Sequence, residues 1–258
     1  MPPLEPEAFY AEIGASTAAL ADLVSEADPA LPVPACPGWT LRNLATHVGR
    51  AHRWAAEITT TRSAEFIRFR AVPDGKFPDD RPAQPAWLNA GAQRVVAAVR
   101  EAGSDPVWAF GSLQPATFWG RRMAHETALH RADAELATGR EPMFAPGLAA
   151  DAIDEWLGFL SGPVYDRPDP RLEALPDGRA LHVHATDGEL AGTGEWLVRH
   201  EQSAIHVDRG HAQADVAIRG PAARLLLVLT RRVPPGDPAV QVFGDPALLS
   251  RWLEHTPL

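Results

Sequence analysis

Residues 121–133 place two ionisable side chains on one face of a predicted helix. On a helical wheel of about 100° per residue, Glu126 and His130 fall inside a mostly apolar stripe that includes Met123. Their i, i+4 spacing sets the two Cβ atoms roughly 5–6 Å apart. A carboxylate and an imidazole on a buried face are costly without partners, and a divalent metal ion would satisfy both. The neighbouring His125 falls on the opposite face and is expected to point to solvent.

A third metal ligand has to come from another helix, and the segment 41–58 offers two histidines. His47 lies within the apolar arc of this segment and is the preferred ligand, while His52 lies on the other edge of the arc and is the reserve. A simpler interpretation also fits the spacing. Glu126 and His130 would then be a helix-stabilising pair, and His47 a hydrogen-bonded core histidine.

The composition is that of a globular protein with a substantial core. The chain has 258 residues, of which 45% are apolar and 22% charged, with a formal net charge of -9. This negative charge argues against nucleic acid or an anionic membrane surface as a partner. No apolar run reaches the length of a membrane helix or resembles a signal peptide, so we expect a cytoplasmic protein. The single cysteine, Cys36, cannot form an internal disulfide and is predicted to be a packed thiol.

The elements that must position these residues are helices in the first half of the chain. Apolar residues recur at helical spacing in each of them, Thr40 is a suitable N-cap for the second, and Gly103 ends the third. Such a succession of amphipathic helices predicts a helix bundle. The predicted helical segments are 9–24, 41–58, 85–102 and 117–139.

The second half of the chain predicts a small α+β domain. After a helix over 149–160, alternating apolar residues indicate strands in a mostly antiparallel sheet, joined by a helix over 221–232 and closed by a helix that Asp245 caps. His182 and His184 share one strand face and are expected on the solvent side. The domains are predicted at 1–145 and 146–258. The strand segments centre on 181–185, 196–198, 205–207, 216–218 and 240–243.

Two motifs resemble the mycothiol-dependent maleylpyruvate isomerase family. The segment 34–49, PACPGWTLRNLATHVG, is similar to the family's N-terminal signature, and 125–135, HETALHRADAE, is similar to its second motif. The resemblance continues through LLLVLTRR at 225–232 and VFGD at 242–245, so it covers nearly the whole chain.

The resemblance implies a DinB-like four-helix bundle that binds one divalent metal ion, usually zinc, followed by a sterol-carrier-like α+β domain. Its metal ligands correspond to His47, Glu126 and His130. The family's substrate-binding arginine best matches Arg232, with Arg231 as the alternative, because this chain has Thr230 and Arg231 where the family usually has Trp-Gly.

The implied activity uses mycothiol as cofactor, with a metal-bound thiolate that adds to a small electrophilic substrate held by the arginine through a carboxylate. The outcome is either cis–trans isomerisation or thiol S-transfer. Two other functions fit the same residues: a non-haem iron enzyme with this ligand set, and a non-enzymatic module that binds a small apolar ligand.

Overall fold

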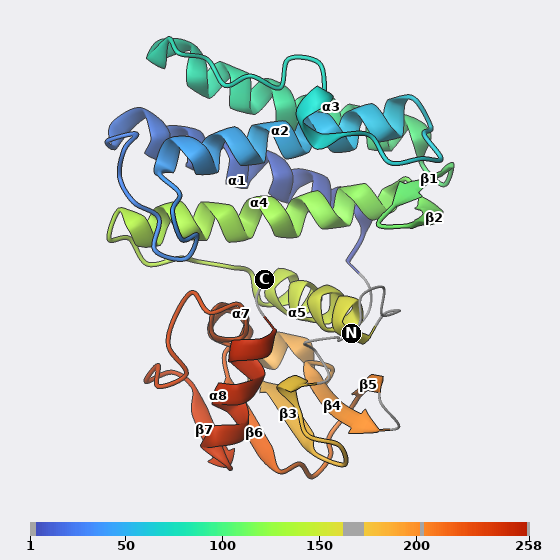
Figure 1. Cartoon of the computed structure of the whole chain (residues 1–258), viewed down its shortest axis with the longest axis vertical. Coiled ribbons are helices and arrows are strands. Elements are labelled where there is room, and N and C mark those ends of the chain that lie inside the picture. Colours follow the sequence, from blue (N-terminus) through green and yellow to red (C-terminus); the bar gives the residue numbers. More distant parts are fainter. Residues whose placement is uncertain (1–3, 162–172, 202–203, 257–258) are drawn as a thin grey trace. The chain divides into compact units, whose positions relative to one another are not determined.

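The computed structural model describes residues 4–161, 173–201 and 204–256. The chain forms two compact units, Leu4–Met143 and Phe144–Leu258. The first is helical and the second combines helices with a sheet, so the predicted α+β class is confirmed (Figure 1). Within the described residues, no helix combines the length and apolar character that a membrane span requires.

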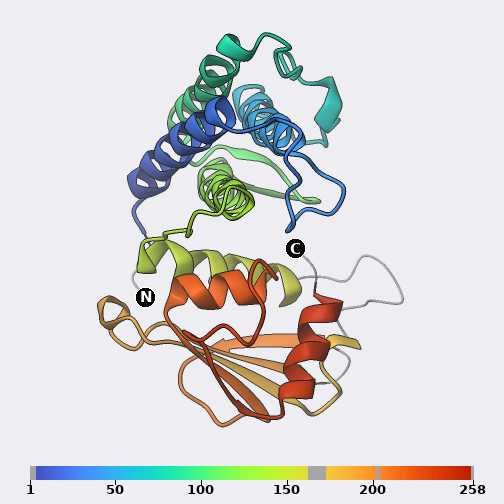
Figure 2. The same ribbon diagram turned by 90° about the vertical axis from the view of Figure 1, so that its left-hand side faces the viewer.

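The helical unit is built from α1 (Pro6–Glu26), α2 (Leu41–Thr60), α3 (Gln84–Ala102) and α4 (Thr117–Ala137), as predicted. Helices α1 and α2 each pack against both α3 and α4, which closes the bundle (Figure 2). Two short 3-10 turns, η1 (Phe69–Ala71) and η2 (Arg81–Ala83), lie between α2 and α3. The core contains the fully buried apolar side chains Ile13, Leu20, Leu41, Leu44, Val48, Ile58, Leu88, Val95 and Trp119.

The start of α2 is fixed by a reciprocal cap. The Thr40 hydroxyl accepts from the Asn43 backbone N–H at 3.3 Å, and the Asn43 side chain accepts from the Thr40 backbone N–H at 2.9 Å. Both otherwise unsatisfied donors are therefore paired, and the N-cap predicted at Thr40 is confirmed. This cap fixes where α2 begins, two turns before His47.

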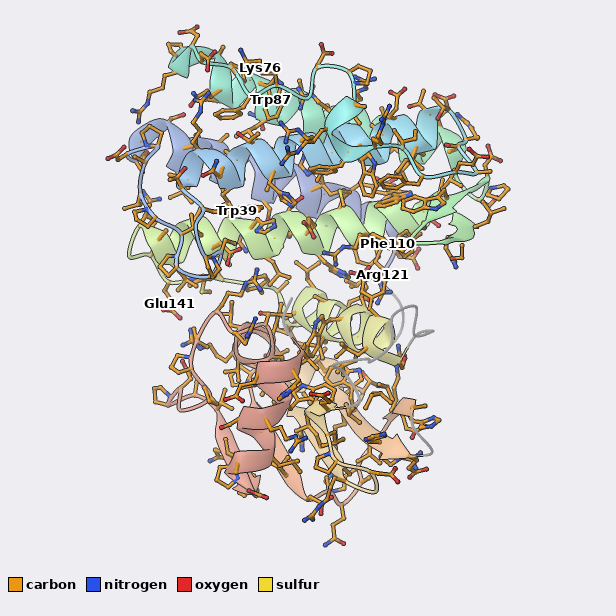
Figure 3. All side chains as sticks on the ribbon, in the orientation of Figure 1. Trp39, Lys76, Trp87, Phe110, Arg121 and Glu141 are labelled. Atoms are coloured by element: carbon orange, nitrogen blue, oxygen red, sulfur yellow. The ribbon has the colours of Figure 1, made fainter. Side chains whose placement is uncertain are left out.

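A β-hairpin between α3 and α4 was not expected from the sequence. Strands β1 (Pro106–Ala109) and β2 (Ser112–Pro115) pair antiparallel across Phe110 and Gly111, which have φ of 44° and 89°. Positive φ at both central positions favours a tight two-residue turn. Phenylalanine rarely adopts this conformation, so Phe110, labelled beside the hairpin in Figure 3, carried no turn signal.

The expectation that His125 points to solvent is wrong. Its exposed fraction is 1%, and its ring meets Phe9 of α1 edge-on, with ring centroids 5.7 Å apart. The prediction treated the face of α4 opposite Met123 as exposed to solvent. Helix α4, however, packs against α1 as well as α2, so the face opposite Met123 is also covered.

The second unit has a five-stranded sheet in the order β5-β4-β3-β6-β7. Strand β3 pairs with β6 in parallel, and the other neighbours are antiparallel, as predicted for a mostly antiparallel sheet. The strands are β3 (Ala180–Ala185), β4 (Glu195–Glu201), β5 (Ala204–Arg209), β6 (Val216–Gly220) and β7 (Gln241–Gly244), with the short turn η3 (Gly188–Leu190) after β3.

Helices α5 (Pro146–Ser161) and α7 (Ala222–Leu229) pack against each other and against strands of the sheet, as Figure 2 shows. Helix α8 (Pro246–His255) also contacts β6. The Asp245 carboxylate caps α8 by accepting from the Ala247 backbone N–H at 3.0 Å, which confirms that cap.

The predicted solvent position of His182 and His184 is wrong for His182. The exposed fraction of His182 is 4%, and His184 is half-buried. Strand β3 is central in the sheet, so residues of β4 and β6 flank His182 on either side. His211 also lies close, with a ring-centroid distance of 5.3 Å. Alternation along one strand indicates which side chains share a face, but not what covers that face.

Replacing the cap tests its contribution. We expect Thr40→Ala to lower the free energy of unfolding of the helical unit by about 1 kcal/mol, because the N-terminal donors of α2 lose a partner. Urea unfolding followed by circular dichroism measures this. The control is Thr60→Ala, an exposed threonine at the other end of α2, for which we expect a change within about 0.5 kcal/mol. Equal effects of the two variants would contradict a capping role.

Candidate metal centre

Three side chains from α2 and α4 meet inside the helical unit. Glu126 Oε1 lies 2.8 Å from His47 Nε2 and 3.3 Å from His130 Nε2. The three donor atoms all lie within 4.8 Å of one another. The structure thus brings together the three residues that the sequence predicts as metal ligands. We call them the His47–Glu126–His130 cluster.

The second carboxylate oxygen of Glu126 faces Arg122, one turn earlier on α4. Oε2 forms an ion pair with the Arg122 guanidinium. Burial alone would raise the pKa of Glu126, but Arg122 and the hydrogen bonds from His130 and His47 hold it well below the usual value. Glu126 is therefore an anion whose two oxygens face different partners, Oε1 the imidazoles and Oε2 the guanidinium.

Asp133 orients the His130 ring from behind. Its Oδ2 lies 2.8 Å from His130 Nδ1, and its side chain is fully buried. Cys36 Sγ lies 3.5 Å from the same oxygen. Burial alone would lower the pKa of His130, but its hydrogen bonds to Asp133, Cys36 and Glu126 raise it well above the usual value. A cation that binds Nε2 must therefore displace a proton.

Aromatic rings flank the cluster on the side of His47. The ring centroids of Trp39 and Phe69 lie 5.0 and 5.6 Å from that of His47, and Trp39 stacks at 6.2 Å on His130. Figure 3 shows Trp39 labelled between α2 and α4. The side chains of His47, Glu126 and His130 remain 26%, 19% and 11% exposed. The side chains of the cluster are therefore partly open to solvent, beside an apolar wall.

The reserve ligand His52 lies outside the cluster. It is fully buried, and its Nε2 lies 2.8 Å from the Thr127 hydroxyl. That hydroxyl donates to the Met123 carbonyl at 2.5 Å, so it must accept from His52 Nε2–H. His52 is thereby held as a neutral core histidine. Burial, with a smaller contribution from Arg53, lowers its pKa to about 3.

The donor set of the cluster fits a divalent metal ion. Two imidazole nitrogens and one carboxylate oxygen are typical zinc ligands, and three protein ligands leave a coordination position open. The carboxylate behind His130 also matches the pattern in which a ligating histidine donates its other N–H to an acidic side chain. This contact favours the tautomer whose Nε2 lone pair faces the cluster.

Arg232, the predicted substrate-binding arginine, lies in the second unit. It follows α7 and lines a hollow of about 490 Å³ together with Arg231 and Ser250. Its Nη1 donates to the Thr230 carbonyl at 2.9 Å. Arg231 has a φ of 60°, so the backbone turns sharply between the two candidate arginines and α7. Both arginines line the same hollow.

Sequence reasoning placed none of four neighbouring residues at the cluster. Asp133 and Arg122 were missed, although both lie one turn from a predicted ligand on α4. The spacing of Asp133 three residues after His130 is the signal that could have found it. Trp39 and Phe69 carried no such signal, because Trp39 precedes α2 and Phe69 lies in the short turn η1, both outside the helices that bear the ligands.

The chain is thus one of a class of two-unit proteins. Its first unit is a helical bundle with a candidate metal centre of two histidines and a carboxylate, and its second is an α+β unit. Within that class, the chain belongs to the mycothiol maleylpyruvate isomerase family. The model of that family's N-terminal domain matches residues 10–135. The model of its C-terminal domain matches residues 147–251.

Two solved structures are similar over most of the chain. One is a crystal structure of the mycothiol-dependent maleylpyruvate isomerase, with 16% identity and a TM-score of 0.57. The other is a variant of that enzyme in which a histidine is replaced by alanine, with 14% identity and a TM-score of 0.58. Each similarity covers 93% of both chains. At these identities the likeness establishes the fold. A comparison with curated proteins finds no match.

The lowered pKa of His52 predicts a specific response to acid. Above about pH 6.5 the histidine is neutral in both folded and unfolded chains; below it the unfolded state binds the extra proton. His52 should therefore cost stability as pH falls from 6.5 toward 3, by roughly 1.4 kcal/mol per pH unit. Urea unfolding at pH 7, 6, 5 and 4 should show a shallower decline for His52→Gln than for the parent chain. Parallel declines would contradict a buried, neutral His52.

Proposed function

We propose that this chain is a mycothiol-dependent enzyme of the maleylpyruvate-isomerase type that binds a divalent metal ion, zinc, through His47, Glu126 and His130. The observation that carries the proposal is the convergence of the three donor atoms within 4.8 Å of one another. The contact between Asp133 and His130 Nδ1 supports it. Family membership supports the choice of thiol.

The proposed reaction is of one type with two outcomes. A bound zinc ion would supply a positive centre that stabilises the thiol of mycothiol as a thiolate. An electrophilic substrate would take up the thiol at a double bond. The substrate double bond would thereby become a single bond, about which the adduct could rotate. Expulsion of the thiol would then restore the double bond as the cis–trans isomer, whereas retention of the thiol would give a conjugate, so the enzyme would be an isomerase or an S-transferase.

The chain's own residues prepare the site for this chemistry. Asp133 holds His130 in one orientation, and Arg122 keeps Glu126 ionised. Glu126 then offers one charged oxygen to the cation while its other oxygen stays paired with Arg122. The rings of Trp39 and Phe69 exclude water from one side of His47, which favours an electrophile with an apolar or planar portion.

The second unit is proposed to be the sterol-carrier-like domain of the enzyme and to supply the substrate-binding arginine. Arg232 would hold a substrate carboxylate through paired N–H donors, since guanidinium and carboxylate match in geometry. Arg231 borders the same hollow and is the alternative. With its single cysteine and no disulfide, the chain is proposed to act in the cytoplasm.

Loss of one ligand tests the metal assignment. We expect His130→Ala to lower the bound divalent metal by one equivalent per chain and to abolish mycothiol-dependent turnover in a screen of electrophiles. Plasma emission spectrometry of the dialysed protein gives the metal content. The control His255→Ala removes a half-buried histidine of α8, outside the cluster, and should retain both properties.

Other outcomes of that screen would contradict the proposal in distinct ways. Full metal content in His130→Ala would remove the ligand assignment. Turnover that needs iron and oxygen but no thiol would make the chain a non-haem iron enzyme. Unchanged binding of a small apolar ligand after metal removal, with no thiol adduct formed on any electrophile, would make it a binding module.

A second variant tests the arginine. We expect Arg232→Gln to raise KM for a carboxylate substrate about 10- to 100-fold, because a charge-assisted pair contributes about 1.5–3 kcal/mol. Arg231→Gln should change KM less, and Arg251→Gln, an exposed arginine of α8, should leave it unchanged. A larger effect of Arg231→Gln would transfer the role to Arg231, and no effect of either would exclude both.

A further inference from the structure

A second group of metal-ligand side chains lies in the sheet of the second unit. It comprises His182 and His184 on β3, Glu195 at the start of β4, and His211 just after β5. His184 and Glu195 are direct partners across the β3–β4 pair, so both project from the same face of the sheet. None of these residues belongs to the His47–Glu126–His130 cluster.

One carboxylate oxygen lies at the centre of the group. Glu195 Oε2 is 2.7 Å from His211 Nδ1, 3.2 Å from His182 Nε2 and 3.7 Å from His184 Nδ1. One donor atom from each residue lies within 4.8 Å of every other. The three imidazole rings also meet pairwise edge to face, at interplanar angles of 65° to 89° and with centroids 5.3 to 6.0 Å apart. The side chains are thus arranged around a shared point.

The buried nitrogen of His182 is the most informative atom of the group. Nε2 has no solvent exposure and no hydrogen-bond partner among the described residues, although it lies 3.2 Å from Glu195 Oε2. Nε2 is therefore a buried polar atom held against a carboxylate oxygen without a hydrogen bond that satisfies it. Such an arrangement is costly, and a cation between the two atoms would satisfy both.

We propose that His182, His184, Glu195 and His211 bind a structural zinc ion. Three imidazoles and one carboxylate are ligands that zinc accepts, and four protein ligands complete a tetrahedral shell. A closed shell is typical of a structural rather than a catalytic site. The ion would link β3, β4 and the segment after β5 through one shared centre.

The experiment isolates this site from the one in the bundle. In the full-length double variant His47→Ala/His130→Ala, which removes two ligands of the bundle cluster, we expect one equivalent of zinc to remain after dialysis. Added zinc should also raise the melting temperature of the metal-free double variant. Cobalt substituted for zinc should give the intense visible absorption of a tetrahedral ion.

Single changes in that background identify the ligands. His211→Ala and His184→Ala should each weaken zinc binding roughly tenfold or more and abolish the thermal shift. The His211 side chain is 76% exposed, so its truncation leaves no buried cavity. The matched control is His206→Ala, an exposed histidine of β5, which should bind zinc normally.

Two results would overturn the proposal. One is a double variant with no bound zinc and no thermal shift. The other is zinc that stays bound when His184 and His211 are both replaced. Either would leave the four residues as a hydrogen-bonded histidine–glutamate network. Neither result bears on the proposed function, since the bundle site is tested separately by the metal that His130→Ala removes from the parent chain.

Discussion

The largely buried carboxylate of Glu126 is the constraint on which the helical unit depends. Its two oxygens face opposite partners: the imidazoles of His47 and His130 on one side and the Arg122 guanidinium on the other. An uncompensated charge in this position would be strongly destabilising, so α2 and α4 must keep the register that supplies all these contacts. The same register also sets three donor atoms around one point. Stability and the candidate chemistry therefore share one geometric requirement.

Several features of α2 maintain that register from a distance. The cap at Thr40 fixes the start of the helix, and Gly49 lets the Trp87 ring of α3 lie against the backbone one half-turn beyond His47. A Cβ at Gly49 would come within 2.0 Å of that ring. The helix is therefore held at its N-terminus by hydrogen bonds and in its middle by close packing. His47 lies between these two points, so its place on the helix relative to Glu126 is held from both sides.

Periodicity and turn chemistry predicted the helices of the bundle, the strands of the sheet and the meeting of His47, Glu126 and His130. They did so because local rules govern where such elements begin and end. The burial of individual side chains was harder to predict from the sequence. His125 and His182 were assigned to solvent because a single helix or strand does not reveal what packs on its second face. The Phe110–Gly111 turn was not predicted because phenylalanine is rare at the first position of such a turn. The role of Asp133 was not predicted because it depends on the tautomer of the His130 ring.

The order of strands in the sheet has a consequence for how the chain emerges during synthesis. Strand β3 pairs with β4 at once but acquires its other neighbour, β6, only after Val216 has been made. Until then one edge of β3 has no strand beside it, and its backbone N–H and C=O groups are unpaired there. All the bundle helices and their clustered side chains precede residue 138. The helical unit can thus finish folding on the ribosome while the sheet is still incomplete and prone to aggregate. A nascent chain that stalls between β5 and β6 would therefore combine a folded first unit with an aggregation-prone second unit.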